Sequence, residues 1–150
     1  MASIDTIFVT RLYRASLAGA RDKRLVAELA RSCRSIAKDD RAGQDWSREH
    51  GYQGYTSYSS LADLAWRDPS IAELVDWLDG HVAEFARALE FDLGKRPLTL
   101  DSLWINILSP GGVHCGHIHP RSVVSGTFYV DVPKGAGALK LEDPRLALMM

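Results

Sequence analysis

Residues Val113–Val132 have the sequence VHCGHIHPRSVVSGTFYVDV, and this stretch decides the fold class that the sequence predicts. Two runs rich in β-forming residues, Val113–His119 and Gly126–Val132, flank a turn at PRS. Further short strands are expected at Leu98–Leu108 and Leu139–Leu141, separated by the turn sequences SPGG and PKGAG. The carboxyl-terminal half is therefore predicted to be a series of short strands.

The amino-terminal half has mainly helical patterns. After a predicted strand at Asp5–Tyr13, apolar residues recur at helical spacing and predict an amphipathic helix over Ala20–Ala37. Lys38–Tyr58 lacks periodicity and is predicted to be a long, ordered, aromatic loop. Ser60 resembles the start of a capping box, which predicts a short helix over Ser60–Trp66.

A stronger helix start follows at Asp68 and Pro69, an N-cap residue and a proline at the first helical position. The apolar stripe behind them predicts a helix to about Phe91, ending near Gly94. Helices followed by a run of strands indicate an α+β fold, in which helices pack outside a β structure.

Composition narrows the class of protein. The 150 residues are 46% apolar and 25% charged, as in a single soluble domain spanning 1–150, and the net charge of −1 gives no global field for nucleic acid. No run approaches the ~20 apolar residues of a membrane helix, and no secretory signal is expected. Two isolated cysteines argue against a disulfide framework. We expect a cytoplasmic protein, and the sequence leaves open whether it forms a homo-oligomer.

His117 and His119 are the candidate metal ligands. Alternate side chains of a strand share a face, so these imidazoles are about 7 Å apart at the backbone and can converge on one ion. His114 falls on the opposite face unless Gly116 marks a bulge. Imidazole suits iron, zinc, copper and nickel. The alternative interpretation is a solvent-facing strand end.

The following strand has one polar and one apolar face. Ser125 and Tyr129 lie on the polar face, with Thr127 and Asp131, and the even-numbered residues are apolar. The polar face lines either a cavity or an ordinary solvated sheet surface. On the preceding strand, Asn106 offers a donor and an acceptor to a carboxylate ligand, although backbone groups could equally satisfy it.

These motifs together resemble a known family. Trp104-Ile105-Asn106, HxHP at His117–Pro120, SGxxYV at Ser125–Val130 and the run Asp143-Pro144-Arg145 are similar to a bacterial branch of the 2-oxoglutarate/Fe(II)-dependent oxygenases. The resemblance covers about Trp104–Arg145 and is looser elsewhere. It implies a double-stranded β-helix (jelly-roll, cupin-like) core with the amino-terminal helices packed outside.

The resemblance also implies the site. Fe(II) would be held by His117 and His119, where the wider superfamily has Asp or Glu in place of His119, and by a third ligand from a later strand. Asn106, Ser125 and Tyr129 would form the wall of the 2-oxoglutarate pocket. No residue is assigned a catalytic role. The sequence does not identify the substrate, which could be a small molecule or a protein.

The sequence departs from the family at its end. No histidine follows His119, and the last basic residue is Arg145. A jelly roll usually has eight strands, whereas four are expected in the β half. We therefore expect the domain to lack its carboxyl-terminal strands and the natural chain to continue past Met150.

Three functions compete at this point. The leading hypothesis is a non-haem Fe(II)/2-oxoglutarate-dependent dioxygenase. The second is a cupin-like metal-binding protein that does not use 2-oxoglutarate and holds its ion by three neutral imidazoles including His114. The third is a non-catalytic jelly-roll binding domain.

Overall fold

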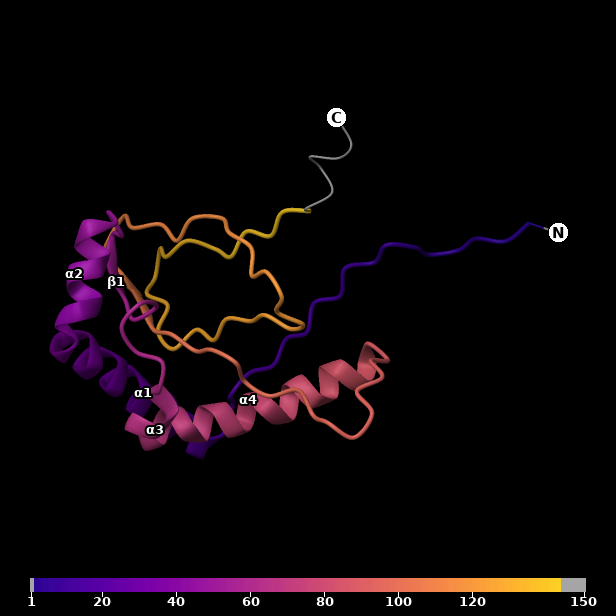
Figure 1. The fold of residues 1–150 in the computed structure, drawn as a ribbon, viewed down its shortest axis with the longest axis horizontal. Coiled ribbons are helices and arrows are strands. Elements are labelled where there is room, and N and C mark those ends of the chain that lie inside the picture. Colours follow the sequence, from indigo (N-terminus) through magenta and orange to yellow (C-terminus); the bar gives the residue numbers. More distant parts are fainter. Residues whose placement is uncertain (1, 144–150) are drawn as a thin grey trace.

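The computed structural model describes residues 2–143 of the chain, and Figure 1 shows a layer of helices beside a long region of irregular chain. The elements in order are α1 (Ala20–Asp39), α2 (Arg41–Glu49), β1 (Gly54–Thr56), α3 (Leu64–Arg67), α4 (Pro69–Ala88) and β2 (Asn106–Leu108). We call α1–α4 the helical layer and residues 109–143 the loop region. The amino-terminal segment extends away from both (Figure 1).

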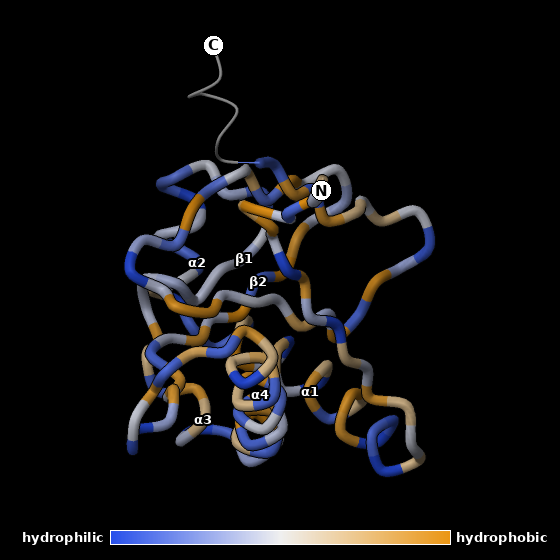
Figure 2. The backbone as a smooth tube through the Cα atoms, turned by 90° about the vertical axis from the view of Figure 1, so that its right-hand side faces the viewer, coloured by the Kyte–Doolittle hydropathy of each residue, from blue (hydrophilic) through white to orange (hydrophobic). Residues whose placement is uncertain are grey.

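One hydrophobic core joins the helices to the two strands. Figure 2 looks along α4, with α1 and α3 on either side and the loop region above them. Leu29 of α1 and Leu64 of α3 are each 1% exposed. The other buried members of the core are Leu25, Tyr55, Ile71, Leu74 and Ile105. Burying apolar side chains of α1, α3, α4 and β1 in this core is the main source of stability for helices of this length.

The two long helices confirm the periodicity argument. α1 begins at the predicted residue and ends at Asp39, two residues beyond the predicted end. α4 begins at Pro69, and the Asp68 carboxylate accepts hydrogen bonds from the Ser70 and Ile71 backbone N–H groups, as an N-cap should. The predicted end near Phe91 is wrong by three residues. Glu90 has φ +57°, a left-handed conformation that an α-helix cannot continue.

The prediction of a loop over Lys38–Tyr58 is wrong, because α2 and β1 both lie within it. α2 is short and polar, so its sequence has no apolar stripe to reveal it. Asp40 supplies its N-cap by accepting a hydrogen bond of 3.0 Å from the Gly43 backbone N–H. A Cβ at Gly43 would come within 2.2 Å of the Asp40 carboxylate, so only glycine allows this close approach.

The short helix starts later than predicted. α3 begins at Leu64 with Asp63 as its N-cap, not at Ser60. The Ser60 hydroxyl donates instead to the Asp40 carboxylate, which also accepts a 2.8 Å hydrogen bond from the Tyr55 hydroxyl. A serine that the sequence presents as a local cap is thus used to join α2 to β1 and to the turn after it.

The structure assigns two strands. β1 and β2 are antiparallel, with Tyr55 opposite Ile107, so the predicted strand over Leu98–Leu108 is confined to its last three residues. Within residues 2–143 no strand is assigned to the other predicted segments, which are Asp5–Tyr13, Val113–His119, Gly126–Val132 and Leu139–Leu141. Their backbone N–H groups do not form a ladder with a neighbouring segment. The jelly roll that the resemblance implies therefore stays a prediction.

None of the helices among the described residues combines the length and apolarity required to cross a membrane.

Candidate functional site

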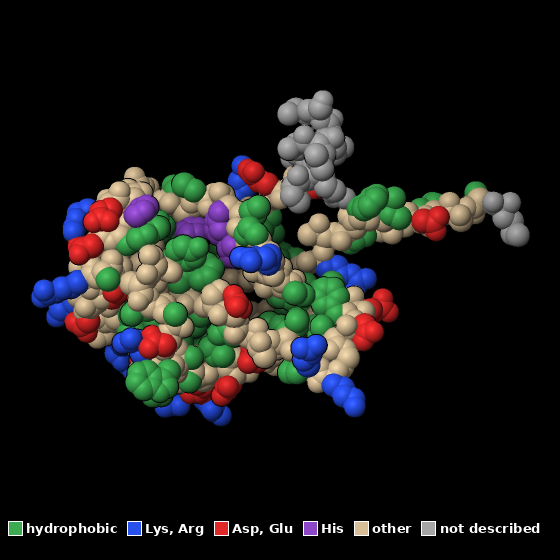
Figure 3. All heavy atoms as spheres, viewed as in Figure 1, with side chains coloured by type: hydrophobic (Ala, Val, Ile, Leu, Met, Phe, Trp, Pro, Cys, Tyr) green, Lys and Arg blue, Asp and Glu red, His purple; other side chains and the backbone are tan. Residues whose placement is uncertain are grey.

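Three histidines gather on the loop region. Space-filling atoms in Figure 3 show histidine side chains grouped on one face, with hydrophobic side chains around them. The ring centroids of His114 and His117 are 4.7 Å apart, and those of His117 and His119 are 4.8 Å apart. All three come from one short segment to which no strand is assigned, so they are brought together within that segment and not by strand pairing.

His117 and His119 form the closest pair. Their Nε2 atoms are 2.8 Å apart, so both rings project to the same side of the backbone, as the alternation predicted. Each ring also has a partner at Nδ1. The Cys115 carbonyl lies 2.9 Å from Nδ1 of His117, and the Ser125 hydroxyl lies 2.8 Å from Nδ1 of His119.

When both rings are neutral, one pair of tautomers satisfies these hydrogen bonds. A carbonyl only accepts, so His117 carries its proton on Nδ1 and leaves Nε2 as an acceptor. His119 then donates from Nε2 to His117, and its Nδ1 accepts from the Ser125 hydroxyl. The chain of donors therefore runs from Ser125 through His119 and His117 to the Cys115 carbonyl.

The same partners suit a metal ion. Ligating imidazoles usually donate their second nitrogen to an oxygen, which His117 already does through Nδ1. His119 would need to move its proton from Nε2 to Nδ1, where the Ser125 hydroxyl can accept as well as donate. Two nitrogens at ~2.0–2.1 Å from one ion lie roughly 2.9–3.4 Å apart. The observed pair is close to that separation, so these two donors fit a shared ion.

His114 adds a third ring beside the pair. Its Nδ1 lies 2.9 Å from the Tyr52 hydroxyl, and its ring is perpendicular to that of His117. Burial lowers the pKa of His114, and the neighbouring His117 and His119 lower it further. The imidazole is thereby held in the neutral form, which is the form that binds metals.

The predicted placement of His114 on the opposite face of a straight strand does not hold, because its ring contacts that of His117. Gly116 lies between the two histidines in a segment without strand geometry. The chain departs there from the regular alternation, as the bulge alternative allowed.

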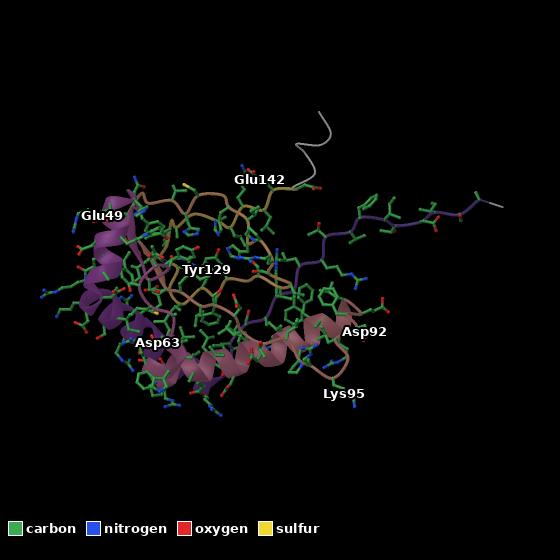
Figure 4. The ribbon with its side chains drawn as sticks, in the orientation of Figure 1. Glu49, Asp63, Asp92, Lys95, Tyr129 and Glu142 are labelled. Atoms are coloured by element: carbon green, nitrogen blue, oxygen red, sulfur yellow. The ribbon has the colours of Figure 1, made fainter. Side chains whose placement is uncertain are left out.

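The residues after Ser125 separate into two sets. Phe128 and Val130 pack against the hydrophobic core. Tyr129 is 55% exposed, and Figure 4 shows it on the chain between the helical layer and the outer part of the loop region. Asp131 forms an ion pair of 2.6 Å with Arg34 of α1. Ser125 is thus the polar-face residue that the structure brings into contact with the histidines.

Asn106 lies on β2, opposite Thr56, and its side chain is exposed. It makes no side-chain hydrogen bond with the described residues, so its amide is available to a ligand. Arg145, the basic residue of the DPR motif, lies outside the residues that the structure describes.

Two aromatic neighbours of the site were not among the predicted site residues. Trp104 places its ring 5.5 Å from that of His119, in an edge contact, and Tyr52 holds His114. The aromatic richness of the segment before β1 is the sequence signal that could have indicated Tyr52. For Trp104 the signal was its place in the WIN motif, beside Asn106.

The two remaining histidines lie elsewhere. His81 packs on Trp77 of α4, and its Nδ1 lies 2.8 Å from the Tyr13 hydroxyl, so its role is in packing. His50 stacks on Trp46 at the end of α2. In the described part of the chain, no group of three or more His, Cys, Asp or Glu side chains converges closely enough to hold a metal ion.

A comparison with protein families matches the segment that contains the clustered histidines. Residues 102–150 match the family described as "Putative 2OG-Fe(II) oxygenase". The match begins just before Trp104, contains all three clustered histidines and confirms the resemblance that the HxHP and SGxxYV motifs predicted. It covers the carboxyl-terminal third of the chain. No curated protein matches the chain.

Proposed function

We propose that this chain is a non-haem Fe(II)/2-oxoglutarate-dependent oxygenase and that His117 and His119 hold its iron. The observation that carries the proposal is the pair of Nε2 atoms 2.8 Å apart, each imidazole having an oxygen partner at Nδ1, within the segment that matches the oxygenase family. Two histidines plus a carboxylate with open coordination positions are typical of this chemistry, and the histidine pair would supply two of those three ligands. The cytoplasmic location and the jelly-roll core remain part of the same proposal.

Each residue has a distinct task. His117 and His119 would bind the ion through Nε2, and the Cys115 carbonyl and the Ser125 hydroxyl would fix their ring orientations. Bound iron and 2-oxoglutarate would supply the oxidising power of the site by activating dioxygen.

Asn106 and Tyr129 would bind the cosubstrate. Both carry exposed polar groups without a partner among residues 2–143, an amide and a phenol that can each donate to a carboxylate. Ser125 would contribute through His119, because its hydroxyl is already engaged there. Ser125 is therefore a positioning residue in this proposal, and Asn106 and Tyr129 are the candidate contacts to 2-oxoglutarate.

Two protein nitrogens alone form a weak iron site. We therefore expect metal affinity to rise when 2-oxoglutarate is present, because a chelating cosubstrate adds ligands, and by linkage 2-oxoglutarate should bind more tightly when metal is present.

The test is an anaerobic titration with Fe(II), with and without 2-oxoglutarate, followed by calorimetry and by the visible charge-transfer band of the iron–2-oxoglutarate chelate. His117→Ala and His119→Ala should abolish the band, and His50→Ala, which removes an exposed histidine outside the cluster, should not. Succinate formed after oxygen is admitted reports turnover. Equal loss of the band in all three variants would contradict the site.

One alternative is a cupin-like metal protein with three imidazole ligands and no use of 2-oxoglutarate. The ring contact between His114 and His117 places a third imidazole beside the pair, although His114 would have to move for all three to converge on one ion. This alternative predicts tight metal binding without 2-oxoglutarate that is lost in His114→Ala. The oxygenase proposal predicts that His114→Ala keeps the 2-oxoglutarate-dependent band.

A further inference from the structure

An aromatic groove lies beside the histidines. Two adjoining hollows, of about 220 and 270 Å³, lie between the segment from Tyr58 to Trp66 and the segment from Leu100 to Trp104. The hollows share Asp101 and its neighbours, so they form one continuous depression, which we call the Trp66 groove. Figure 4 labels Asp63, which lies at this groove next to α3.

The walls of the Trp66 groove are aromatic and acidic. Trp66 is 86% exposed and Tyr58 is 63% exposed, and the Trp104 ring completes the aromatic set. Two carboxylates and no lysine or arginine are among the lining residues. Aromatic faces and carboxylates both attract cations. The lining is therefore complementary to a positively charged ligand.

The two carboxylates are not equivalent. Arg67 binds the Asp63 carboxylate at 2.5 Å, which neutralises it. Asp101 forms no ion pair and no hydrogen bond with the described residues, and it is an exposed residue that lines both hollows. Asp101 is thus the carboxylate available to a cation.

One wall of the groove also presents unpaired backbone. The residues from Leu100 to Trp104 belong to no assigned helix or strand, and their N–H and C=O groups make no hydrogen bond with other described residues. Pairing resumes at Ile105, whose N–H donates to the Ser57 hydroxyl. A segment with unpaired backbone groups next to a strand is a template to which a peptide can add as a further strand.

The groove adjoins the candidate metal site through one side chain. Trp104 lines the groove next to Tyr58, with their rings 5.3 Å apart, and makes an edge contact with His119 at 5.5 Å. A ligand on the groove side of Trp104 would therefore lie about one ring width from the histidine pair. That is the position that a substrate-binding surface would have.

We propose that the Trp66 groove binds the substrate as an extended peptide carrying a lysine or arginine side chain. The cationic head would lie between Asp101 and the aromatic rings, and the peptide backbone would pair with the segment from Leu100 to Trp104. The assignment of this peptide as a substrate rests on the oxygenase function proposed above.

A peptide fits better than a free small amine. Each hollow is smaller than the ~300 Å³ at which pockets begin to enclose small ligands, and both are open to solvent. An isolated amine would bury little surface there, whereas an extended chain spans both hollows and gains backbone hydrogen bonds along the way.

The experiment measures binding before chemistry. The probes are a capped heptapeptide of six glycines with a central lysine, the same peptide with central arginine or neutral norleucine, and capped lysine alone. Binding is followed by tryptophan fluorescence and calorimetry at low salt. The variants are Asp101→Asn and Trp66→Ala, with Asp79→Asn, an exposed carboxylate on α4 outside the groove, as the matched control. Circular dichroism confirms that each variant is folded.

The lysine and arginine peptides should bind about fivefold more tightly than the norleucine peptide, and Asp101→Asn should remove most of that difference. Trp66→Ala should weaken all three peptides about threefold, and Asp79→Asn should change nothing. Equal affinity for lysine and norleucine would overturn the proposal, as would equal affinity for capped lysine and the heptapeptide. A dimer that Trp66→Ala dissociates would assign the groove to a second copy instead.

Succinate formation with the same peptides separates the two proposals. Charge-dependent binding without succinate keeps the groove as a peptide site and overturns the oxygenase function. Succinate formed equally with lysine and norleucine peptides keeps the oxygenase function and overturns the substrate class. Succinate formed with the basic peptides and reduced severalfold by Asp101→Asn supports both.

Discussion

In the helical layer Leu29 and Leu74 are 1% and 5% exposed, whereas in the loop region Val113 and Ile118 are 65% and 78% exposed. The backbone differs in the same way. The helices satisfy their own N–H and C=O groups, while the hydrogen bonds between backbone groups of the loop region are local turns, such as Ser122 to His119, and a bond from Ser109 to Gln53. The helical layer is therefore stabilised by its buried core, whereas the loop region is held by a few contacts.

The candidate metal site lies in the less tightly packed of these two regions. The clustered histidines lie in the region with fewer structural constraints, attached to the helical layer by Phe128, Val130 and the ion pair of Arg34 with Asp131. The loop region exposes several apolar side chains, such as Val113 and Ile118, which a double-stranded β-helix would cover. A jelly-roll core therefore stays our proposal for the fold of this region.

Truncating a core residue of the helical layer should have the largest effect. Leu29→Ala removes a side chain that is 1% exposed and should lower the free energy of unfolding by about 3 kcal/mol. Leu139→Ala makes the same chemical change in the loop region, where the side chain is 58% exposed, and should cost less than about 0.5 kcal/mol. Urea unfolding followed by circular dichroism measures both, and similar losses would remove the contrast between the regions.

Phe128 tests whether the loop region is attached to the helical layer. Its ring lies 5.9 Å from that of Trp77 of α4 and packs against the core. Phe128→Ala should destabilise the protein by about 2 kcal/mol, less than a fully buried phenylalanine would. The neighbouring Tyr129→Ala, at a half-exposed position, is the control and should be nearly neutral. A neutral Phe128→Ala would mean that the loop region is not packed on the helices in solution.

The sequence predicted those parts whose signals are local. Asp68 and Pro69 predicted the start of α4, because an N-cap residue and a proline at the first helical position act within one helical turn. The proximity of His117 and His119 was predictable for a similar reason, since alternation holds in any extended backbone, whether or not it is paired.

The features that the sequence did not predict depend on contacts between residues that are far apart in the sequence. α2 lacks an apolar stripe, and its packing depends on Gly43 approaching Asp40, Ser60 and Tyr55. Trp104 contacts His119 across fifteen positions of chain, a contact that no local pattern reveals. The strands expected in the loop region had β-forming residues, but a strand also requires a neighbour for its N–H groups, and propensity cannot supply one.

Asp40 should show a smaller, pH-dependent effect. Burial would raise the pKa of its carboxyl, but hydrogen bonds from Ser60, the Gly43 N–H and Tyr55 outweigh burial, so the pKa is lowered. A lowered pKa stabilises the fold above about pH 4, the unfolded value, and this stability is lost as pH falls further.

Asp40→Asn should therefore cost about 1–2 kcal/mol at pH 7, and the difference from the wild type should shrink below about pH 4. Denaturant unfolding at a series of pH values measures it. The adjacent Asp39→Asn, which changes an exposed carboxylate without a partner among the described residues, serves as the control. A difference that stays constant down to pH 2 would show that the charge of Asp40 is not involved.

The ion pair between Arg34 and Asp131 should have the smallest effect, although it directly joins the two regions. Its atoms are 2.6 Å apart, but the side chains are 61% and 59% exposed, so water and salt screen the attraction. A double-mutant cycle of Arg34→Ala and Asp131→Asn should give a coupling free energy of about 0.5 kcal/mol or less, decreasing as salt is added. A coupling that exceeds about 1.5 kcal/mol and persists in high salt would require the pair to be shielded from water. The loop region would then lie closer to the helical layer than its exposed side chains indicate. The two regions would then differ less in how tightly they are packed.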